Sequence, residues 1–195
     1  GTPGLSFGKK EKKMGWNSQH TAMVHFDECR VPIENLVGQE GDGFKIAMAG
    51  LDGGRINIAS CSVGGARSAL EFSVAYSQDR IQFGKAISQF QSIQFKIADM
   101  ATDVDAARLM VHRAAQSLDL KKPEATMHCA MAKRWATDIG SKVCNEALQI
   151  HGGYGYLKDF PLEKLVRDLR VHQILEGTNE IMQLIISKRL LGNKS

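Results

Sequence analysis

The sequence predicts a mainly helical protein, an antiparallel four-helix bundle preceded by a short β-rich region. Three observations point to this fold. Alternation with a period of two residues, typical of strands, is confined to residues 1–41. From residue 42 to residue 195, apolar residues recur three and four positions apart, as on one face of a helix. The helical segments are joined by short connections, which favour antiparallel packing of neighbours.

Composition and charge exclude several classes of protein. The chain has 195 residues and a formal net charge of +4, with Lys and Arg scattered along it. The one basic run, Lys9 to Lys13, lacks the interleaved aromatic residues of a nucleic-acid-binding patch, so no nucleic-acid partner is expected. No stretch is long and apolar enough for a membrane span. The four cysteines have no CxxC spacing, which favours a reduced intracellular compartment over a disulfide framework or a metal site.

Residues 1–41 are predicted to form strands and turns. Alternate residues from Thr21 to Phe26 share one face, which is the pattern of a half-buried strand, and Val31-Pro32 ends it. A region this short cannot close a sheet on itself, so its strands should pair with strands outside the chain. The abrupt start at Gly1, without a Met or a targeting segment, also indicates a piece of a longer protein.

The first helix is expected from an N-cap at Asp42 to about Gln78. Its buried face should carry Phe44, Ala47, Met48 and Leu51. The run Asp52-Gly53-Gly54-Arg55 interrupts it, and each glycine costs a helix about 1 kcal/mol relative to Ala. A bend for packing and the close approach of a ligand would each explain the glycine pair.

The next two helices have continuous apolar seams. The second helix should bury Ile93, Ile97, Met100, Val104, Ala107 and Val111. The third should start near Pro123, end at Gly152 or Gly153, and bury Met127, Met131, Trp135, Ile139, Val143 and Ala147. Methionines at this spacing indicate core packing, and the absence of a Glu-x-x-His motif gives no support to a di-iron bundle.

The stretch best suited to a catalytic role precedes the last helix. A short helix from about Leu162 to Leu169 leads to Glu176, which follows two apolar residues. A carboxylic acid against an apolar wall has its pKa raised towards the range of a general base. Gly177 permits a positive φ or the close approach of a ligand, and Thr178 can cap the final helix. Taken alone, the stretch is better explained as an ordinary loop acid before a helix cap.

Several motifs, taken together and in order, resemble the acyl-CoA dehydrogenase family. They are Asp52-Gly53-Gly54-Arg55, Arg80 to Gly84 with Gln91, His151-Gly152-Gly153-Tyr154-Gly155-Tyr156 and Leu175-Glu176-Gly177-Thr178-Asn179-Glu180. The resemblance covers essentially the whole chain. It implies that residues 1–41 are the last part of the family's middle β domain and that residues 42–195 are its C-terminal helical bundle. Two further runs, Gly53 to Cys61 and Gln149 to Asp159, are most similar to the branch that acts on short branched acyl groups, although Asp52 stands where Asn is expected there.

The resemblance implies FAD-dependent α,β-dehydrogenation of an acyl-CoA thioester. The expected reaction converts isobutyryl-CoA to methacrylyl-CoA in valine breakdown, with Glu176 removing the α-proton while the β-hydride leaves for flavin N5. Some members carry the base at the position of Gly54 instead, and Gly54 has no side chain, so the resemblance assigns the base to Glu176. The alternatives are a short-chain or 2-methylbutyryl-CoA dehydrogenase, or a helical bundle kept as a non-catalytic interaction module.

The resemblance also implies roles for other residues and partners. Contacts with FAD are expected from Arg80, Phe90, Gln91, Gln149, Ile150, His151, Gly152, Gly153, Thr178, Asn179 and Glu180. Contacts with the acyl-CoA are expected from Asp52, Gly53, Gly54, Arg55, Gly177 and Lys188. Because two subunits contact each FAD in the family, a homotetramer built as a dimer of dimers is expected. Electron-transfer flavoprotein is the expected electron acceptor, and the mitochondrial matrix the expected location. The chain by itself is expected to bind FAD weakly or not at all and to be inactive.

Overall fold

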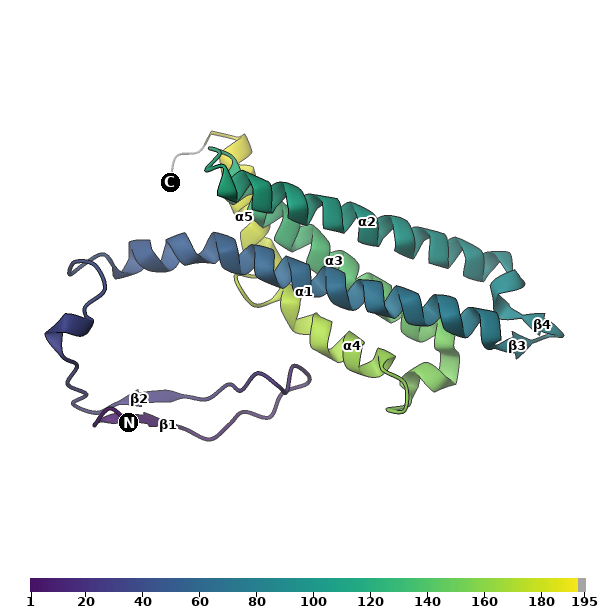
Figure 1. The fold of residues 1–195 in the computed structure, drawn as a ribbon, viewed down its shortest axis with the longest axis horizontal. Coiled ribbons are helices and arrows are strands. Elements are labelled where there is room, and N and C mark those ends of the chain that lie inside the picture. Colours follow the sequence, from purple (N-terminus) through teal and green to yellow (C-terminus); the bar gives the residue numbers. More distant parts are fainter. Residues whose placement is uncertain (193–195) are drawn as a thin grey trace.

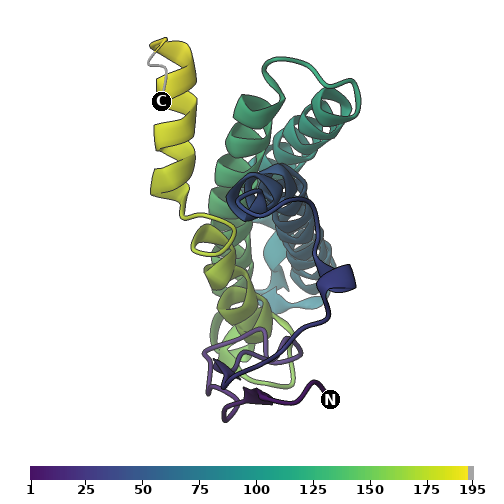
Figure 2. The same cartoon turned by 90° about the vertical axis from the view of Figure 1, so that its left-hand side faces the viewer.

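A computed structural model describes residues 1–192 (Figures 1 and 2). Three long helices lie side by side: α1 (Gly43–Asp79), α2 (Gln91–Asp119) and α3 (Ala125–His151). Helix α2 runs antiparallel to both of the others, so α1 and α3 run in the same direction. Two shorter helices, α4 (Leu162–Arg170) and α5 (Asn179–Leu190), both pack against α3. The predicted mainly helical bundle is therefore confirmed.

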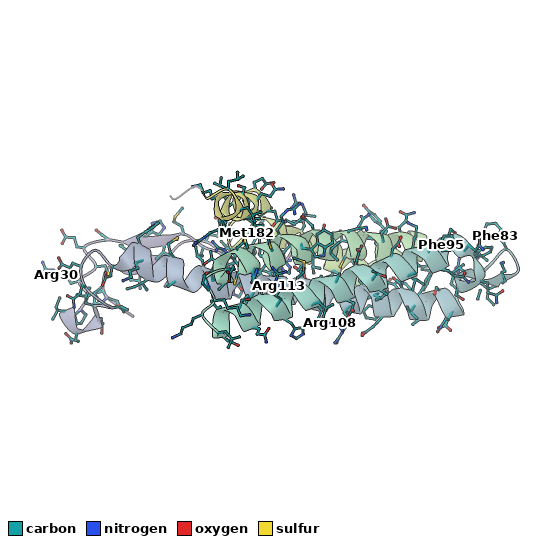
Figure 3. All side chains as sticks on the ribbon, turned by 90° about the horizontal axis from the view of Figure 1, so that it is seen from above. Arg30, Phe83, Phe95, Arg108, Arg113 and Met182 are labelled. Carbon is teal, nitrogen blue, oxygen red and sulfur yellow. The ribbon has the colours of Figure 1, made fainter. Side chains whose placement is uncertain are left out.

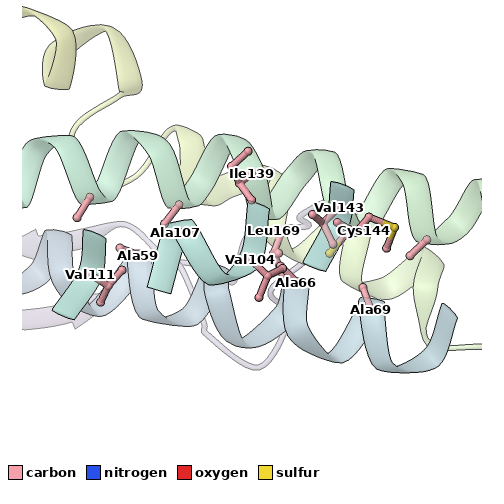
Figure 4. Close-up of a cluster of buried hydrophobic side chains, with 14 of the residues drawn as sticks. Ala59, Ala66, Ala69, Val104, Ala107, Val111, Ile139, Val143, Cys144 and Leu169 are labelled. Carbon is pink, nitrogen blue, oxygen red and sulfur yellow. The ribbon is translucent and has the colours of Figure 1, made fainter. Parts of the chain in front are cut away.

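The core lies between α1, α2 and α3 and consists largely of small side chains. Small residues at helix contacts allow the helix axes to approach closely. The predicted seam of α2 is confirmed, because its last four members are buried and Ile93 and Ile97 pack against the edge of the core. Figure 4 shows the cluster, which includes Ala59, Ala66 and Ala69 of α1, Val104, Ala107 and Val111 of α2, and Ile139, Val143 and Cys144 of α3.

Leu169 of α4 inserts between α1 and α3 at a point where both helices carry a glycine. It is 4% exposed. A Cβ added at Gly65 of α1 would lie 2.7 Å from Leu169 Cδ1, and a Cβ added at Gly140 of α3 would lie 3.2 Å from its Cδ2. The two glycines thus make room for α4, which in turn positions the loop that follows it.

Helix α1 differs from its prediction in two respects. It runs without a break through Asp52 to Arg55, because a helix of 37 residues held by packing tolerates the cost of two glycines. Its first turns have helical periodicity, but their apolar face is not covered by any of residues 1–192. Phe44 is 77% exposed and Met48 is 44% exposed.

Helix α3 follows its prediction in its second half, but the first three members of the predicted stripe are not buried. Met127 and Met131 are only half-buried. Ile139, Val143 and Ala147 are buried. Trp135, which was expected in the same stripe, is 38% exposed, because the buried face passes through Ala132 and Ala136 instead. Gly152 ends the helix with a φ of 58°, as predicted for a C′ glycine.

The β-rich region forms a two-stranded antiparallel ribbon of β1 (Leu5–Phe7) and β2 (Val24–Phe26), followed by a 3-10 turn, η1 (Ile33–Asn35). The predicted strand is present but not half-buried, since Phe7 and Phe26 are 68% and 73% exposed. A ribbon of two strands is marginally stable alone. The prediction that these strands pair with others outside the chain stays open.

The loop between β1 and β2 is anchored to α4. The Trp16 N–H donates to Asp168 Oδ1 at 2.6 Å, and the Arg167 guanidinium donates to the Met14 carbonyl at 2.8 Å. A Cβ added at Gly15 would lie 2.6 Å from the same Asp168 oxygen, so only glycine permits this approach. The β region and the bundle therefore meet beside the segment that carries Glu176.

The opposite end of the bundle carries a short hairpin, β3 (Ile81–Gln82) and β4 (Lys85–Ala86), with a 3-10 turn, η2 (Ile87–Gln89). Phe83 at its tip is 93% exposed and projects beyond the helices (Figure 3). Two further 3-10 turns, η3 (Gly152–Tyr156) and η4 (Val171–Gln173), flank α4. Within residues 1–192, the apolar runs of the helices fall short of what a bilayer crossing requires.

Candidate active site and cofactor pockets

The Glu176 loop joins η4 to α5 and has an unusual backbone. Glu176 and Gly177 both lie in the left-handed region, with φ values of 55° and 87°. The prediction for Gly177 is confirmed, whereas the positive φ of Glu176 had no signal in the sequence. Thr178 is the N-cap of α5, as predicted, and its hydroxyl accepts the Ile181 N–H at 3.5 Å. A non-glycine residue in the left-handed region is strained and persists only where its surroundings hold it.

The Glu176 carboxylate lies directly against α1. A Cβ added at Gly54 would lie 2.4 Å from Glu176 Oε2, which no side chain could tolerate without displacing the carboxylate. Glu176 and Gly54, which were predicted from the sequence to belong to the same active site, are therefore neighbours in the structure. This contact also explains the glycine at position 54, since the close approach at this point comes from the protein's own carboxylate.

The two charged residues of the Asp52–Arg55 run are tied to each other, and Asp52 is also tied to α3. Asp52 accepts a hydrogen bond from the Arg55 guanidinium at 2.7 Å and one from the Thr126 hydroxyl at 2.7 Å. Arg55 is 7% exposed, and its Nε has no partner within residues 1–192. Both charged groups are thus used inside the bundle, and they fix the position of α1 next to Glu176.

A buried lysine that the sequence analysis did not single out supports the same loop. Lys133 of α3 is fully buried, and its ammonium donates to the Gly177 carbonyl at 2.7 Å and to Asn179 Oδ1 at 3.0 Å. Burial lowers the pKa of Lys133 to about 8, an effect that Asp138 opposes. Its position in the sequence, among the apolar residues of the buried face of α3, was a signal that could have identified it.

Six of the predicted cofactor residues meet at the hairpin end of the bundle. Arg80, Ile150, His151, Gly152 and Gly153 line one pocket of about 450 Å³, and Gln149 precedes them on α3. Tyr76 and Tyr154, which were not predicted, also line it. The Arg80 guanidinium lies 5.2 Å from the Tyr154 ring centroid, and the Tyr76 ring stacks on His151 at 4.2 Å.

His151 has a structural role in this pocket. It is 4% exposed, and its Nδ1 donates to the Ala147 carbonyl at 2.8 Å, while the Tyr76 hydroxyl donates to the His151 carbonyl at 3.3 Å. Burial lowers the pKa of the imidazole. The ring is therefore a neutral, fixed part of the pocket wall.

Thr178, Asn179 and Glu180 line a separate, smaller pocket of about 260 Å³ at the start of α5. Arg134 and Arg170 contribute to the same pocket. A helix start suits a negatively charged group, and two guanidinium groups lie nearby, but the carboxylates of Asp138 and Glu180 line the same pocket and offset this charge.

The remaining predicted residues lie apart from these groups. Phe90 is the N-cap of α2, with the Lys85 ammonium 4.4 Å from its ring centroid, and Gln91 is exposed beside it. Lys188 is exposed in the last turn of α5, roughly 14 Å along the helix axis from Asn179. In residues 1–192, no three His, Cys, Asp or Glu side chains are grouped in a way that could hold a metal ion.

The chain belongs to the acyl-CoA dehydrogenase family. Residues 41–191 match the family model described as "Acyl-CoA dehydrogenase, C-terminal domain". The mitochondrial isobutyryl-CoA dehydrogenase of Bos taurus is 55% identical over 191 residues, which are 98% of this chain and 46% of the relative.

Solved structures agree with this assignment. The butyryl-CoA dehydrogenase of Megasphaera elsdenii is 48% identical, with a TM-score of 0.95 over 98% of this chain and 50% of that one. A structure described as the electron transferring flavoprotein of Acidaminococcus fermentans is 49% identical, with a TM-score of 0.95 over 98% of this chain and 50% of that one. The chain thus spans about half the length of the relatives it matches.

Proposed function

We propose that this chain forms the carboxyl-terminal part of an FAD-dependent dehydrogenase that oxidises a short branched acyl-CoA, with Glu176 as the base. The observation that carries this proposal is the placement of the Glu176 carboxylate against Gly54. Glu176 has a strained backbone conformation, and its carboxylate lies beside α1 at a point where Gly54 has no side chain. Family membership supports the reaction type.

Glu176 accepts the proton from the α-carbon of the thioester. An α-proton is too weakly acidic for a carboxylate to remove unless the thioester carbonyl is polarised by hydrogen-bond donors. The Glu176 N–H supplies one such donor, because it has no acceptor among the hydrogen bonds of residues 1–192. When bound, FAD provides the acceptor for the hydride that leaves the β-carbon, so that a carbon–carbon double bond forms.

The residues of each pocket fit a part of a dinucleotide. Arg80 offers a cation and Tyr154 an aromatic face, while Gly152 and Gly153 leave open space beside them. Thr178 lines the second pocket, where the N-terminus of α5 suits a phosphate oxygen. These contacts support FAD as the cofactor.

The separation of the pockets supports a homo-oligomer, which we propose is a tetramer built as a dimer of dimers. Helix α1 joins Gly54, next to Glu176, to Arg80 at its other end. At about 1.5 Å per residue, this part of the helix is roughly 40 Å long. That exceeds the length of one FAD, so the two ends of the bundle would contact different FAD molecules, each shared with a neighbouring subunit.

Isobutyryl-CoA is the substrate we propose, and methacrylyl-CoA the product. The bovine relative is named for this substrate, and Gly54 adds no side chain beside the Glu176 carboxylate, so the α-carbon that faces this carboxylate can carry a methyl branch. The likeness to a butyryl-CoA dehydrogenase favours a short-chain acyl-CoA as the second candidate.

The setting we propose is valine breakdown in the mitochondrial matrix, with electron-transfer flavoprotein as the electron acceptor. The name of the bovine relative supports the mitochondrion, and the likeness to the Acidaminococcus electron transferring flavoprotein structure supports the acceptor. We also propose that residues 1–41 are the end of the middle β domain and that residues 42–195 are the bundle domain.

Anaerobic bleaching of the flavin by isobutyryl-CoA tests the proposed function. It requires a protein of the full family length that contains this chain. The chain by itself should bind FAD weakly or not at all, because residues 1–41 supply only the end of the β domain that we propose covers the flavin ring. A tight yellow complex of the chain alone would contradict this part of the proposal.

A further inference from the structure

Lys133 is the only lysine among residues 1–192 that is fully buried, and packing alone does not account for it. An ammonium group loses hydration when it is buried, and here both of its acceptors are uncharged amide oxygens. A Met or Leu would fill a bundle core at no such cost. A buried charge that the fold does not require indicates a role in the nearby site.

The two hydrogen bonds of Lys133 end on the two sides of Thr178. The Gly177 carbonyl belongs to the residue directly after Glu176, and Asn179 is the first residue of α5. Glu176 and Gly177 are the two residues with left-handed backbone conformations in this loop. The ammonium therefore holds the strained part of the loop at a fixed distance from α3.

Asn179 links this arrangement to a second point on α3. Its side-chain amide donates to Asp138 Oδ1 at 2.7 Å and to Thr137 Oγ1 at 3.0 Å, while its oxygen accepts from Lys133. The start of α5 is thus fixed to two successive turns of α3. On the other side of the loop, Gly54 of α1 limits where the Glu176 carboxylate can go.

We propose that Lys133 is a positioning residue for Glu176, which acts by holding the Gly177 carbonyl and thereby fixing the Glu176 carboxylate against α1. This inference rests on the proposed function of Glu176 as the base. Lys133 is fully buried and donates to the loop, so it should not contact substrate or flavin itself. Its effect should therefore appear in the rate of proton removal and not in the binding of the acyl-CoA.

Three substitutions in the full-length holoenzyme test the proposal. Lys133→Met keeps the volume and removes all donors, Lys133→Gln keeps a shorter donor, and Lys142→Met removes an exposed lysine from the same helix as a control. The measurements are the FAD content, the limiting rate of anaerobic flavin reduction by isobutyryl-CoA, and the acyl-CoA concentration that gives half of that rate.

The Lys133→Met protein should retain its FAD and reduce it about 10- to 100-fold more slowly, because misplacement of a reacting group by about 1 Å costs a factor of this size. The half-saturating concentration should change less than about 3-fold. Lys133→Gln should give an intermediate rate, and Lys142→Met the wild-type rate. If Lys133→Met fails to fold, the same comparison is made with Lys133→Gln.

Two results would overturn the proposal. One is a folded Lys133 variant with the wild-type reduction rate, and the other is a variant whose defect lies only in the half-saturating concentration. Glu176→Gln in the same assay separates this inference from the proposed function. If that variant is reduced as fast as the wild type, Glu176 is not the base, whatever the Lys133 variants do.

Discussion

The Glu176 carboxylate occupies the space that a side chain on Gly54 would need. A Cβ built on Gly54 would lie 2.9 Å from the carboxylate carbon, closer than real Cβ contacts allow. A residue of α1 and a residue of the last loop thus constrain each other. A substitution of Gly54 by alanine should therefore lower activity without lowering stability.

Gly54→Ala should reduce activity without unfolding the protein. Alanine stabilises a helix interior by about 1 kcal/mol relative to glycine, but here the added methyl group must displace the Glu176 carboxylate. We expect flavin reduction by isobutyryl-CoA to slow by about 100-fold, with no fall in the midpoint of thermal unfolding. Gly64→Ala is the matched control, because no atom lies within 4 Å of a Cβ added there. It should raise the midpoint and leave the rate alone. A Gly54→Ala protein with wild-type activity would show that the carboxylate does not act from this position.

Gly65→Ala should destabilise the protein, in contrast to the same substitution one residue earlier. The added methyl group would overlap Leu169 Cδ1, and forced overpacking of this kind costs about 1–3 kcal/mol. Urea unfolding of the Gly65→Ala, Leu169→Ala and double variants measures the effect. The double variant should lose less than the sum of the two single losses, because removal of the Leu169 side chain makes room for the methyl group. Additive losses would mean that the two residues do not touch.

The stability of the protein should depend on His172 below neutral pH. His172 is 1% exposed, its Nδ1 lies 2.7 Å from Ser62 Oγ, and its Nε2 has no partner within residues 1–192. Burial lowers the pKa of His172 to about 4. Between pH 6.5 and about 4 the unfolded chain binds a proton that the folded chain does not, so the free energy of unfolding falls as the pH falls.

Protonation of His172 changes the free energy of unfolding by at most about 1.4 kcal/mol per pH unit. Denaturant unfolding at several pH values should give a flatter dependence for His172→Gln than for the wild type. His112→Gln, at an exposed position of α2, is the control and should leave the dependence unchanged. Parallel curves for the wild type and His172→Gln would contradict the assignment of this proton to His172.

Arg80 should contribute to FAD retention and not to the chemical step. A hydrogen bond to a charged group contributes about 1.5–3 kcal/mol, so Arg80→Met should weaken FAD binding about tenfold or more. Arg67→Met removes an exposed guanidinium from the same helix and should bind FAD like the wild type. The measurement is a fluorescence titration of the apoprotein with FAD. Equal affinities for the two variants would exclude Arg80 from the cofactor site.

Features set by a few neighbouring residues could be predicted from the sequence. The Thr178 cap, the positive φ of Gly177 and the Gly152 helix end depend on the local chemistry of hydroxyl groups and glycine, and all three are present. Helical periodicity likewise predicted which residues of α2 are buried. The face of α3 was predicted less well at Trp135, because an apolar residue at the right spacing can still lie at the edge of the buried stripe.

Features that depend on contacts between distant segments could not be predicted in this way. The contact between Gly54 and Glu176 requires the packing of α1 against the last loop, and the sequence alone offered a bend or a ligand as the reason for the glycine. The support from Lys133 requires α3 to pass beneath the same loop. The places of Tyr76 and Tyr154 in the Arg80 pocket depend on the packing of α1 against η3.

Anaerobic flavin reduction by wild type and Glu176→Gln tests the central claim most directly. The full-length protein is mixed with isobutyryl-CoA, 2-methylbutyryl-CoA or butyryl-CoA, and the loss of flavin absorbance is followed. We predict rapid bleaching of the wild type by isobutyryl-CoA and none by this thioester in Glu176→Gln, whose amide cannot accept the proton. Faster bleaching by another acyl-CoA would keep the base and change the substrate. Undiminished bleaching of Glu176→Gln would contradict the account, because the base would then lie elsewhere.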